Sequence, residues 1–329
     1  MLCDPLSHFS DPIAEAHNEG VPTETTEFSF LDAQAAALGV AVPTVSRIAL
    51  DLPDGRSLSA LRYGDAAPVV TFLHGAGLNA HTWDATILAL GLPALAIDLA
   101  GHGDSSWRED LDYTARPHAA DVAAALDAWT EGPQVVVGQS LGGLTAAALA
   151  AARPDLVRAV VIVDITPGID TSGGPAALRA FYGVTDFASR DEAVDHALSF
   201  GLGGTRENTE RGVFLNTRVR PDGRVEWKHH LARLAAHAFA GEGADAAPGQ
   251  ILQEDGWDDL AGVSAPITLV RALHGFVSAE DAADFARRLP SARVTTLDAP
   301  HNAQETAPVA LADLVRQHLD PQHPEGSRD

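Results

Sequence analysis

The sequence contains very little cysteine and lysine, and it has no long hydrophobic run. Cys3 is the only cysteine among 329 residues, so no disulfide can form within the chain and the fold does not depend on an oxidising compartment. The Ala-rich run Thr145–Ala152 is much shorter than the roughly 18 apolar residues of a membrane span. The N-terminus, MLCDPLSHFSDP, lacks a basic segment followed by an apolar one, so we expect no signal peptide and a cytoplasmic protein.

Positive charge is also scarce. There are 22 basic residues, of which only Lys228 is a lysine, and 45 acidic residues, so the formal net charge is -23. A surface this negative repels nucleic-acid phosphates and anionic lipids, so neither is an expected partner. A small, uncharged and fairly apolar molecule is the expected partner, and the protein is expected to be a monomer or a homodimer.

Hydrophobic residues make up 46% of the chain, which is enough for a large core. After an extension over residues 1–42, with one helix near Leu31–Leu38, short apolar runs alternate with helical patterns. Such uninterrupted apolar strands are typical of a parallel sheet that is covered on both faces. The pattern therefore predicts an α/β fold with a doubly wound, mostly parallel sheet.

The alternation of strands and helices stops after Asp164 and resumes near residue 263. The intervening residues 167–262 show helical stretches and Gly-rich breaks, which predict an inserted, mainly helical cap. We therefore assign residues 43–166 and 263–320 to the core and residues 321–329 to a polar tail.

The strongest chemical signal is Gly138-Gln139-Ser140-Leu141-Gly142, which lies between an apolar strand and an Ala-rich helix. This context is the one that a nucleophile elbow requires, because a tight turn there raises the serine hydroxyl above the sheet edge at a helix N-terminus. The glycines remove Cβ atoms that would clash in such a turn. Ser140 is therefore the predicted nucleophile, the alternative being an ordinary exposed serine in a tight turn.

With this elbow, the chain resembles the α/β-hydrolase superfamily over roughly residues 44–319. The stretch His74-Gly75-Ala76-Gly77 is similar to the family's oxyanion-hole loop. The resemblance implies that the backbone amides of Ala76 and Leu141 bind the oxyanion, and that His74 is structural.

A second matching segment runs from Asp98 to Ser105 and includes His102. The resemblance implies that these three residues shape a loop beside the active site. A third match, Ala299-Pro300-His301-Asn302, is similar to the loop that supplies the catalytic base, although proline stands where the family usually has glycine. An imidazole there can accept the serine proton near neutral pH, so His301 is the expected base.

The catalytic acid is less clear from the sequence. The position after the penultimate strand, where the family usually carries it, has no carboxylate before Glu280 and Asp281. Asp164 follows the strand after the nucleophile helix, in a stretch that resembles several small esterases. We predict that Asp164 orients His301. Glu280 or Asp281 as the acid, or a dyad without an acid, are the alternatives.

The substrate pocket is predicted from residues near these motifs and in the cap: Gly75, Gln139, His274, Trp227 and Phe181. Each of the cap aromatics could instead belong to the cap's own core. The sequence carries no P-loop, no early GxGxxG and no HExxH, so we expect neither a cofactor nor a metal.

These residues predict a serine hydrolase that cleaves a carboxylic ester, lactone or thioester through an acyl-enzyme. C–C bond hydrolysis and cofactor-free perhydrolysis on the same residues are alternatives. A third possibility, from a different class, is a sensor that binds a small molecule without turnover.

Overall fold

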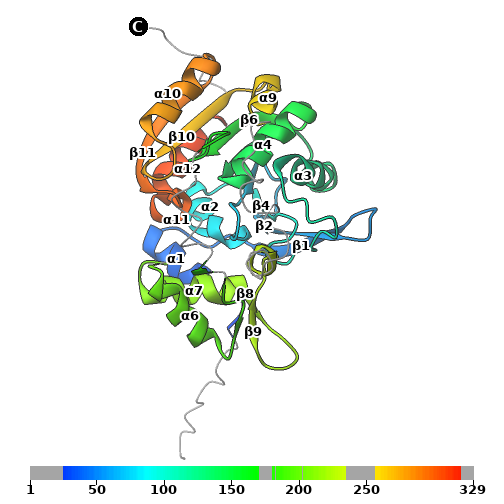
Figure 1. Cartoon of the computed structure of the whole chain (residues 1–329). Helices are drawn as coiled ribbons and strands as arrows, with labels where there is room; N and C mark the ends of the chain where they lie inside the picture. Colours follow the sequence, from blue (N-terminus) through cyan, green and yellow to red (C-terminus); the bar gives the residue numbers. More distant parts are fainter. Residues whose placement is uncertain (1–24, 170–179, 182, 202, 235–255, 320–329) are drawn as a thin grey trace, which may run out of the picture.

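The computed structural model describes residues 25–169, 180–181, 183–201, 203–234 and 256–319. Its centre is an eight-stranded sheet with the strand order β1-β2-β4-β3-β5-β6-β10-β11 (Figure 1). The contacts between β1, β2 and β4 are antiparallel, and all the others are parallel. The strands span β1 Val45–Asp51, β2 Ser57–Tyr63, β3 Val70–Leu73, β4 Ala94–Asp98, β5 Gln134–Gln139, β6 Val157–Val163, β10 Ile267–His274 and β11 Arg293–Pro300. The sheet confirms the predicted fold class.

Helices cover both faces of this sheet, as the uninterrupted apolar strands predict. In β5, Val136 packs into one apolar cluster, whereas Val135 and Val137 pack into the cluster on the opposite face. The first cluster contains residues of α3 Ala115–Trp129, α4 Leu141–Ala152, α9 Gly256–Gly262 and α10 Ala279–Arg288. The second contains residues of η1 Ala80–Trp83, α2 Asp84–Leu90, α11 Ala303–Thr306 and α12 Pro308–Arg316.

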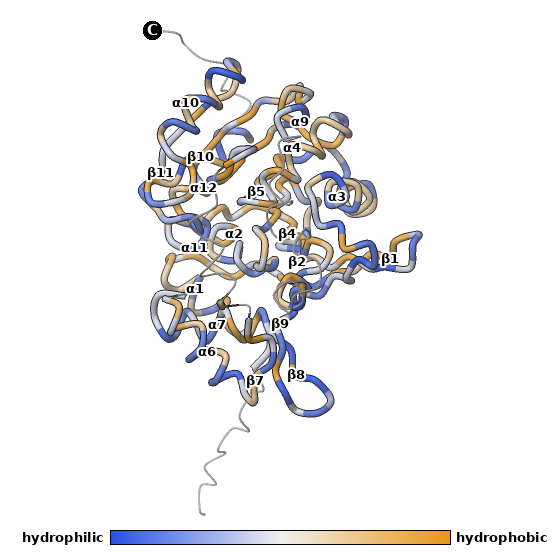
Figure 2. The backbone as a smooth tube through the Cα atoms, in the orientation of Figure 1, coloured by the Kyte–Doolittle hydropathy of each residue, from blue (hydrophilic) through white to orange (hydrophobic). Residues whose placement is uncertain are grey.

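Hydropathy follows this layering. In Figure 2 the hydrophobic colour runs along the central strands and α4, whereas the turn between β8 Thr217–Val219 and β9 Val225–Trp227 is hydrophilic. None of the helices that the structure describes is both long enough and apolar enough to span a membrane.

The end of the predicted N-terminal extension packs against the core. Helix α1, Leu31–Leu38, has the bounds predicted from the sequence, and its buried Leu31 and Ala35 contact Leu88 of α2. Before this helix, Glu27 accepts hydrogen bonds from Arg47 of β1, with Nε–Oε1 at 3.0 Å. Another nitrogen of the same guanidinium lies 2.7 Å from Asp98 Oδ2, at the end of β4. Arg47 therefore ties the N-terminal segment to the loop that follows β4.

The region predicted as a helical cap also contains strands. Besides α6 Arg190–Ser199 and α7 Arg206–Asn216, it holds a small antiparallel sheet of β7 Asp186–Phe187, β9 Val225–Trp227 and β8 Thr217–Val219. Helix α9 lies inside the predicted cap range, yet its Leu260 packs into the core cluster on α4. We therefore propose that the cap ends before residue 256 and that α9 belongs to the core.

Candidate active site

The turn between β5 and α4 places Ser140 in a conformation that few side chains adopt. Its φ is +52° and its ψ is -121°. The turn is close because two glycines allow it: a Cβ on Gly138 would lie 2.1 Å from the Gly142 carbonyl oxygen, and one on Gly142 would lie 2.2 Å from that of Leu73. The cost of this strained backbone is of order 1–3 kcal/mol, so the surrounding packing must hold it in place. Ser140 thus stands partly exposed at the carboxyl end of β5, directly before α4.

Two backbone amides beside Ser140 are free to bind a negative charge. In the part of the chain that the structure describes, neither Ala76 N–H nor Leu141 N–H donates to a backbone carbonyl. Leu141 is the first residue of α4, where the helix dipole favours negative charge. The two loops that carry these amides lie against each other, since a Cβ on Gly75 would come within 2.1 Å of Gln139 Oε1 and 3.2 Å of Ser140 Cβ.

Asp164 and His301 form the central contact of the site. Asp164 follows β6, the neighbour of β5, and like Ser140 has a positive φ, of +53°. Its side chain is fully buried, and Oδ2 accepts a hydrogen bond from His301 Nδ1 at 2.7 Å. Because Nδ1 donates to this carboxylate, Nε2 is the ring nitrogen that can accept a proton.

The end of β10 and the turn after it supply three backbone amides to the same carboxylate. Ala272 N–H and Val277 N–H donate to Asp164 Oδ1 at 3.0 and 3.3 Å, and Phe276 N–H donates to Oδ2 at 2.7 Å. A Cβ on Gly275 would lie 2.0 Å from Oδ2, so the turn can approach this closely only with glycine there. The end of β10, which carries no catalytic acid of its own, therefore binds and positions Asp164, the residue that follows β6.

The alternative acids lie elsewhere. Asp281 forms a capping box with Ser278 at the start of α10, with Ser278 N–H donating to Asp281 Oδ2 at 2.9 Å. Glu280 is exposed in the first turn of the same helix. The structure thus brings Asp164, and neither of these two, to His301.

The His301 loop is joined to the elbow through Gln139. The side-chain Nε2 of Gln139 donates to the His301 carbonyl and to Asn302 Oδ1, both at 3.4 Å. Among the described residues, no hydrogen bond joins Ser140 Oγ to the His301 ring. Gln139, predicted to contact substrate, is fully buried and connects these two loops.

The side chains of three predicted pocket residues contact partners other than Ser140, His301 and Asp164. The imidazole of His274 is 70% exposed and pairs with Asp298 at 3.0 Å. Phe181 and Trp227 pack against each other in the cap's own apolar cluster, with ring centroids 5.3 Å apart. These aromatics are therefore cap core, the alternative that the sequence left open for them.

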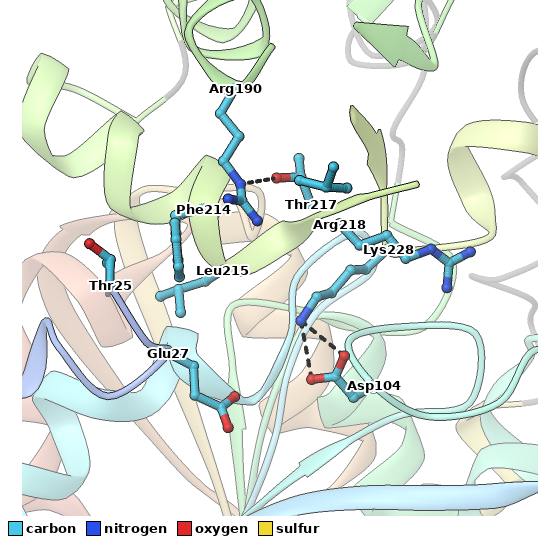
Figure 3. Close-up of a pocket in the computed structure, with 10 residues that line it drawn as sticks. Thr25, Glu27, Asp104, Arg190, Phe214, Leu215, Thr217, Arg218 and Lys228 are labelled. Carbon is cyan, nitrogen blue, oxygen red and sulfur yellow. Dashed lines mark hydrogen bonds and ion pairs between the residues drawn. The ribbon is translucent and has the colours of Figure 1, made fainter. Parts of the chain in front are cut away.

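A cavity of about 720 Å³ lies between the cap and the core. Figure 3 shows residues that line it. Arg190 and Phe214 line it from the cap, and the ion pair of Lys228 with Asp104 lies on another side. Neither Ser140 nor His301 is among the described residues that line it. No group of three or more potential metal ligands occurs in the described ranges.

The loop residues expected to be structural are buried and hydrogen-bonded. His74 Nδ1 donates to the Gly75 carbonyl at 2.8 Å, and its Nε2 accepts from Leu99 N–H at 3.0 Å. Asp98 accepts from Ala80 N–H at 2.8 Å, and Ser105 Oγ donates to the Asp98 carbonyl at 2.6 Å. Both ring nitrogens of His74 are used within the fold.

Burial also sets the charge of the structural histidines. It lowers the pKa of His74 to about 4, and the pKa of His102, whose tilted ring lies 5.1 Å away between centroids, to about 3. Burial lowers the pKa of His81 as well, but the carboxylates of Asp84 and Glu27 outweigh it and raise that pKa to about 9. At neutral pH the first two rings are neutral and the third is charged.

These opposite shifts predict a stability maximum near pH 6.5. His74 and His102 bind protons more readily in the unfolded chain, so the free energy of unfolding falls as the pH drops from 6.5 toward 4. His81 binds its proton more tightly in the folded chain, so its contribution is complete below pH 6.5 and is lost as the pH rises through about 9. Each proton changes the stability by roughly 1.4 kcal/mol per pH unit. Urea unfolding from pH 4.5 to 9 measures this; a stability that is flat across that range contradicts it.

Comparison with known proteins places the chain in a family. The model of the alpha/beta hydrolase fold family matches residues 68–308, so the chain belongs to that family and is a hydrolase. The esterase Rv0045c of Mycobacterium tuberculosis is 38% identical, over 91% of this chain and 97% of its own length. A solved structure of that esterase superposes with a TM-score of 0.72 at 35% identity, covering 91% of this chain and all of its own.

Two further relatives widen the comparison. Lipase LipV of Mycobacterium tuberculosis is 29% identical over 79% of this chain and 97% of its own length. The structure of E-2-(acetamidomethylene)succinate hydrolase covers 84% of this chain and all of its own, with a TM-score of 0.72 at 24% identity, a likeness that concerns the fold.

Two features of the site were missed in the sequence analysis. Gly275 and Phe276 contact Asp164, and Phe276 also stacks on His301. A signal was present, because a Gly-Phe pair stands where the family usually has its acid. The Gly275-Phe276 pair could be interpreted only with the knowledge that this turn contacts Asp164.

Proposed function

We propose that the chain is a serine esterase that hydrolyses carboxylic esters through an acyl-enzyme on Ser140. The observation that carries the proposal is the hydrogen bond of 2.7 Å between His301 Nδ1 and Asp164 Oδ2, at the end of the strand beside the Ser140 elbow. Ester hydrolysis is also supported by relatives named as an esterase and a lipase.

In the proposed mechanism, Ser140 Oγ attacks the ester carbonyl while His301 Nε2 takes its proton. Asp164 stabilises the imidazolium and holds the ring in its tautomer. The negative charge that develops on the carbonyl oxygen is bound by the amides of Ala76 and Leu141. Removing one such donor costs about 3 kcal/mol of transition-state stabilisation in well-studied hydrolases.

The second half of the reaction reverses these roles. His301 returns the proton to the departing alcohol, which leaves an acyl group on Ser140. A water molecule, deprotonated by His301, then attacks this acyl group, and the carboxylic acid departs as Ser140 regains its proton. Hydrogen bonds between nucleophile and base are often formed only when substrate is bound, which fits the missing Ser140–His301 contact.

The acyl chain is expected to be apolar and uncharged. Leu273, near the end of β10, and Phe276, on the turn that follows, expose apolar surface, with 45% and 53% of their area accessible. The net charge of -23 disfavours anionic substrates near this rim. The cytoplasmic location and the monomeric or dimeric state remain predictions of the sequence.

Labelling with a fluorophosphonate tests the nucleophile directly. The native protein is expected to react at one residue, and peptide mapping is expected to find the label on Ser140. Heat-denatured protein is the control and is expected to stay unlabelled, because an unactivated serine does not react. A label on any other residue, or none, contradicts the mechanism. A panel of esters, a lactone and a vinylogous diketone then separates ester cleavage from C–C bond cleavage.

A further inference from the structure

Phe276 contacts both the base and the acid of the proposed triad. Its ring stacks on the His301 imidazole with a centroid distance of 3.8 Å and an interplanar angle of 20°. Its backbone N–H donates to Asp164 Oδ2 at 2.7 Å, the same oxygen that accepts from His301 Nδ1. One residue thus fixes the carboxylate from one side and covers a face of the ring that this carboxylate orients.

The position of Phe276 is set by buried neighbours, although its own ring is half exposed. It lies between Gly275, which must be small to clear Asp164, and Val277, which is buried in the core and donates its amide to Asp164 Oδ1. A backbone held on both sides leaves the Phe276 side chain little freedom except its own rotation. The exposure of the ring therefore does not arise from a loose turn.

We propose that Phe276 is a positioning residue for the ester hydrolysis proposed above, on which this inference rests. Its ring limits the rotation of the His301 imidazole about the hydrogen bond to Asp164. The negative face of an aromatic ring also attracts a cation, so the stack strengthens when His301 carries the serine proton. The interaction therefore favours the imidazolium that accompanies the tetrahedral intermediate more than the neutral base.

The charged groups around the His301 ring are few. Asp164, at the end of β6, is the charged residue of the described chain that contacts the ring. His274 of β10 and Asp298 of β11 form their own exposed pair. The loop of His301 is held by the uncharged Gln139. A shift of the acidic midpoint of the pH–rate profile in a Phe276 variant can therefore be attributed to the lost ring.

Replacing the ring by an aliphatic side chain tests the proposal. With a short-chain p-nitrophenyl ester, Phe276→Leu is expected to lower kcat about fivefold with little change in KM, since a lost cation–π contact is worth about 1 kcal/mol. The acidic midpoint of the pH–kcat/KM profile is expected to move to lower pH by about half a unit, because the protonated base is no longer favoured. Phe276→Tyr keeps the ring and is expected to retain both values.

The matched control is Val309→Ala, which removes exposed apolar surface from α12, outside the proposed site, and is expected to leave kcat and the midpoint unchanged. A wild-type kcat and midpoint in Phe276→Leu overturn the proposal. A lower kcat with an unmoved midpoint also overturns it, because general loosening of the turn gives that result.

The wild type and Ser140→Ala are measured in parallel. If Ser140→Ala stays active, the esterase mechanism itself fails; if it is inactive and Phe276→Leu equals the wild type, only this inference fails.

Discussion

Replacing Ser140 with alanine is expected to lower kcat for a short-chain p-nitrophenyl ester by on the order of 10⁴- to 10⁶-fold, the range found for hydrolases that lose their nucleophile. KM is expected to change little, because the amides of Ala76 and Leu141 still bind the ester. The residual rate comes from those amides, which need no nucleophile to stabilise negative charge.

The fold is expected to survive this change. Ser140 Oγ makes no hydrogen bond within the described chain, so its removal leaves no buried partner unpaired. The urea midpoint is therefore expected to match that of the wild type. Ser199→Ala, at an exposed position near the end of α6, is the control and is expected to keep full activity. A Ser140→Ala protein with more than a tenth of the wild-type rate contradicts the mechanism.

Asp164→Asn is expected to lower kcat by about 10³- to 10⁴-fold, since the same change in a serine protease triad has an effect of about 10⁴. The amide group carries no charge to stabilise the imidazolium. It also has only one oxygen, whereas the carboxylate accepts from three backbone amides and from His301. Each carboxylate oxygen accepts from two donors, so two of these four donors must then face an NH₂ group.

This mismatch also costs stability, by about 1–3 kcal/mol for a buried donor left unpaired. Measuring kcat and urea unfolding on one preparation separates the two effects, because the unfolding cost cannot account for a 10³-fold loss in folded protein. Glu280→Gln is the matched control, since Glu280 was, with Asp281, one of the alternative acids and is exposed on α10. If Glu280→Gln lost more activity than Asp164→Asn, the acid would have to be reassigned.

The features that could be predicted from the sequence depend on local patterns. The elbow needs an apolar strand, a glycine-flanked serine and a helix in succession, and all three lie within the stretch from Gln134 to Ala152. Asp164 could be placed beside the elbow because it follows the next strand of a parallel sheet. The two strands pair at Gln139 and Val163, so the residues that follow them are neighbours.

The features that could not be predicted depend on distant contacts. His274 points to solvent, and Trp227 packs inside the cap, because of neighbours that their own segments do not indicate. Strands β7, β8 and β9 have only two or three residues, which is too short for a periodic pattern to be detected. The Phe276 stack joins residues 25 positions apart through a turn whose closeness depends on Gly275.

The link from Glu27 through Arg47 to Asp98 bears on where the smallest stable unit begins. Judged by strand pattern alone, the chain could be shortened to start at residue 43. Such trimming removes Glu27, whose carboxylate pairs with the mostly buried guanidinium of Arg47 and with a protonated His81. Two cations then share less negative charge beside the loop that follows β4. A fragment with the full stability of this domain therefore has to begin upstream of the first strand, at or before residue 27.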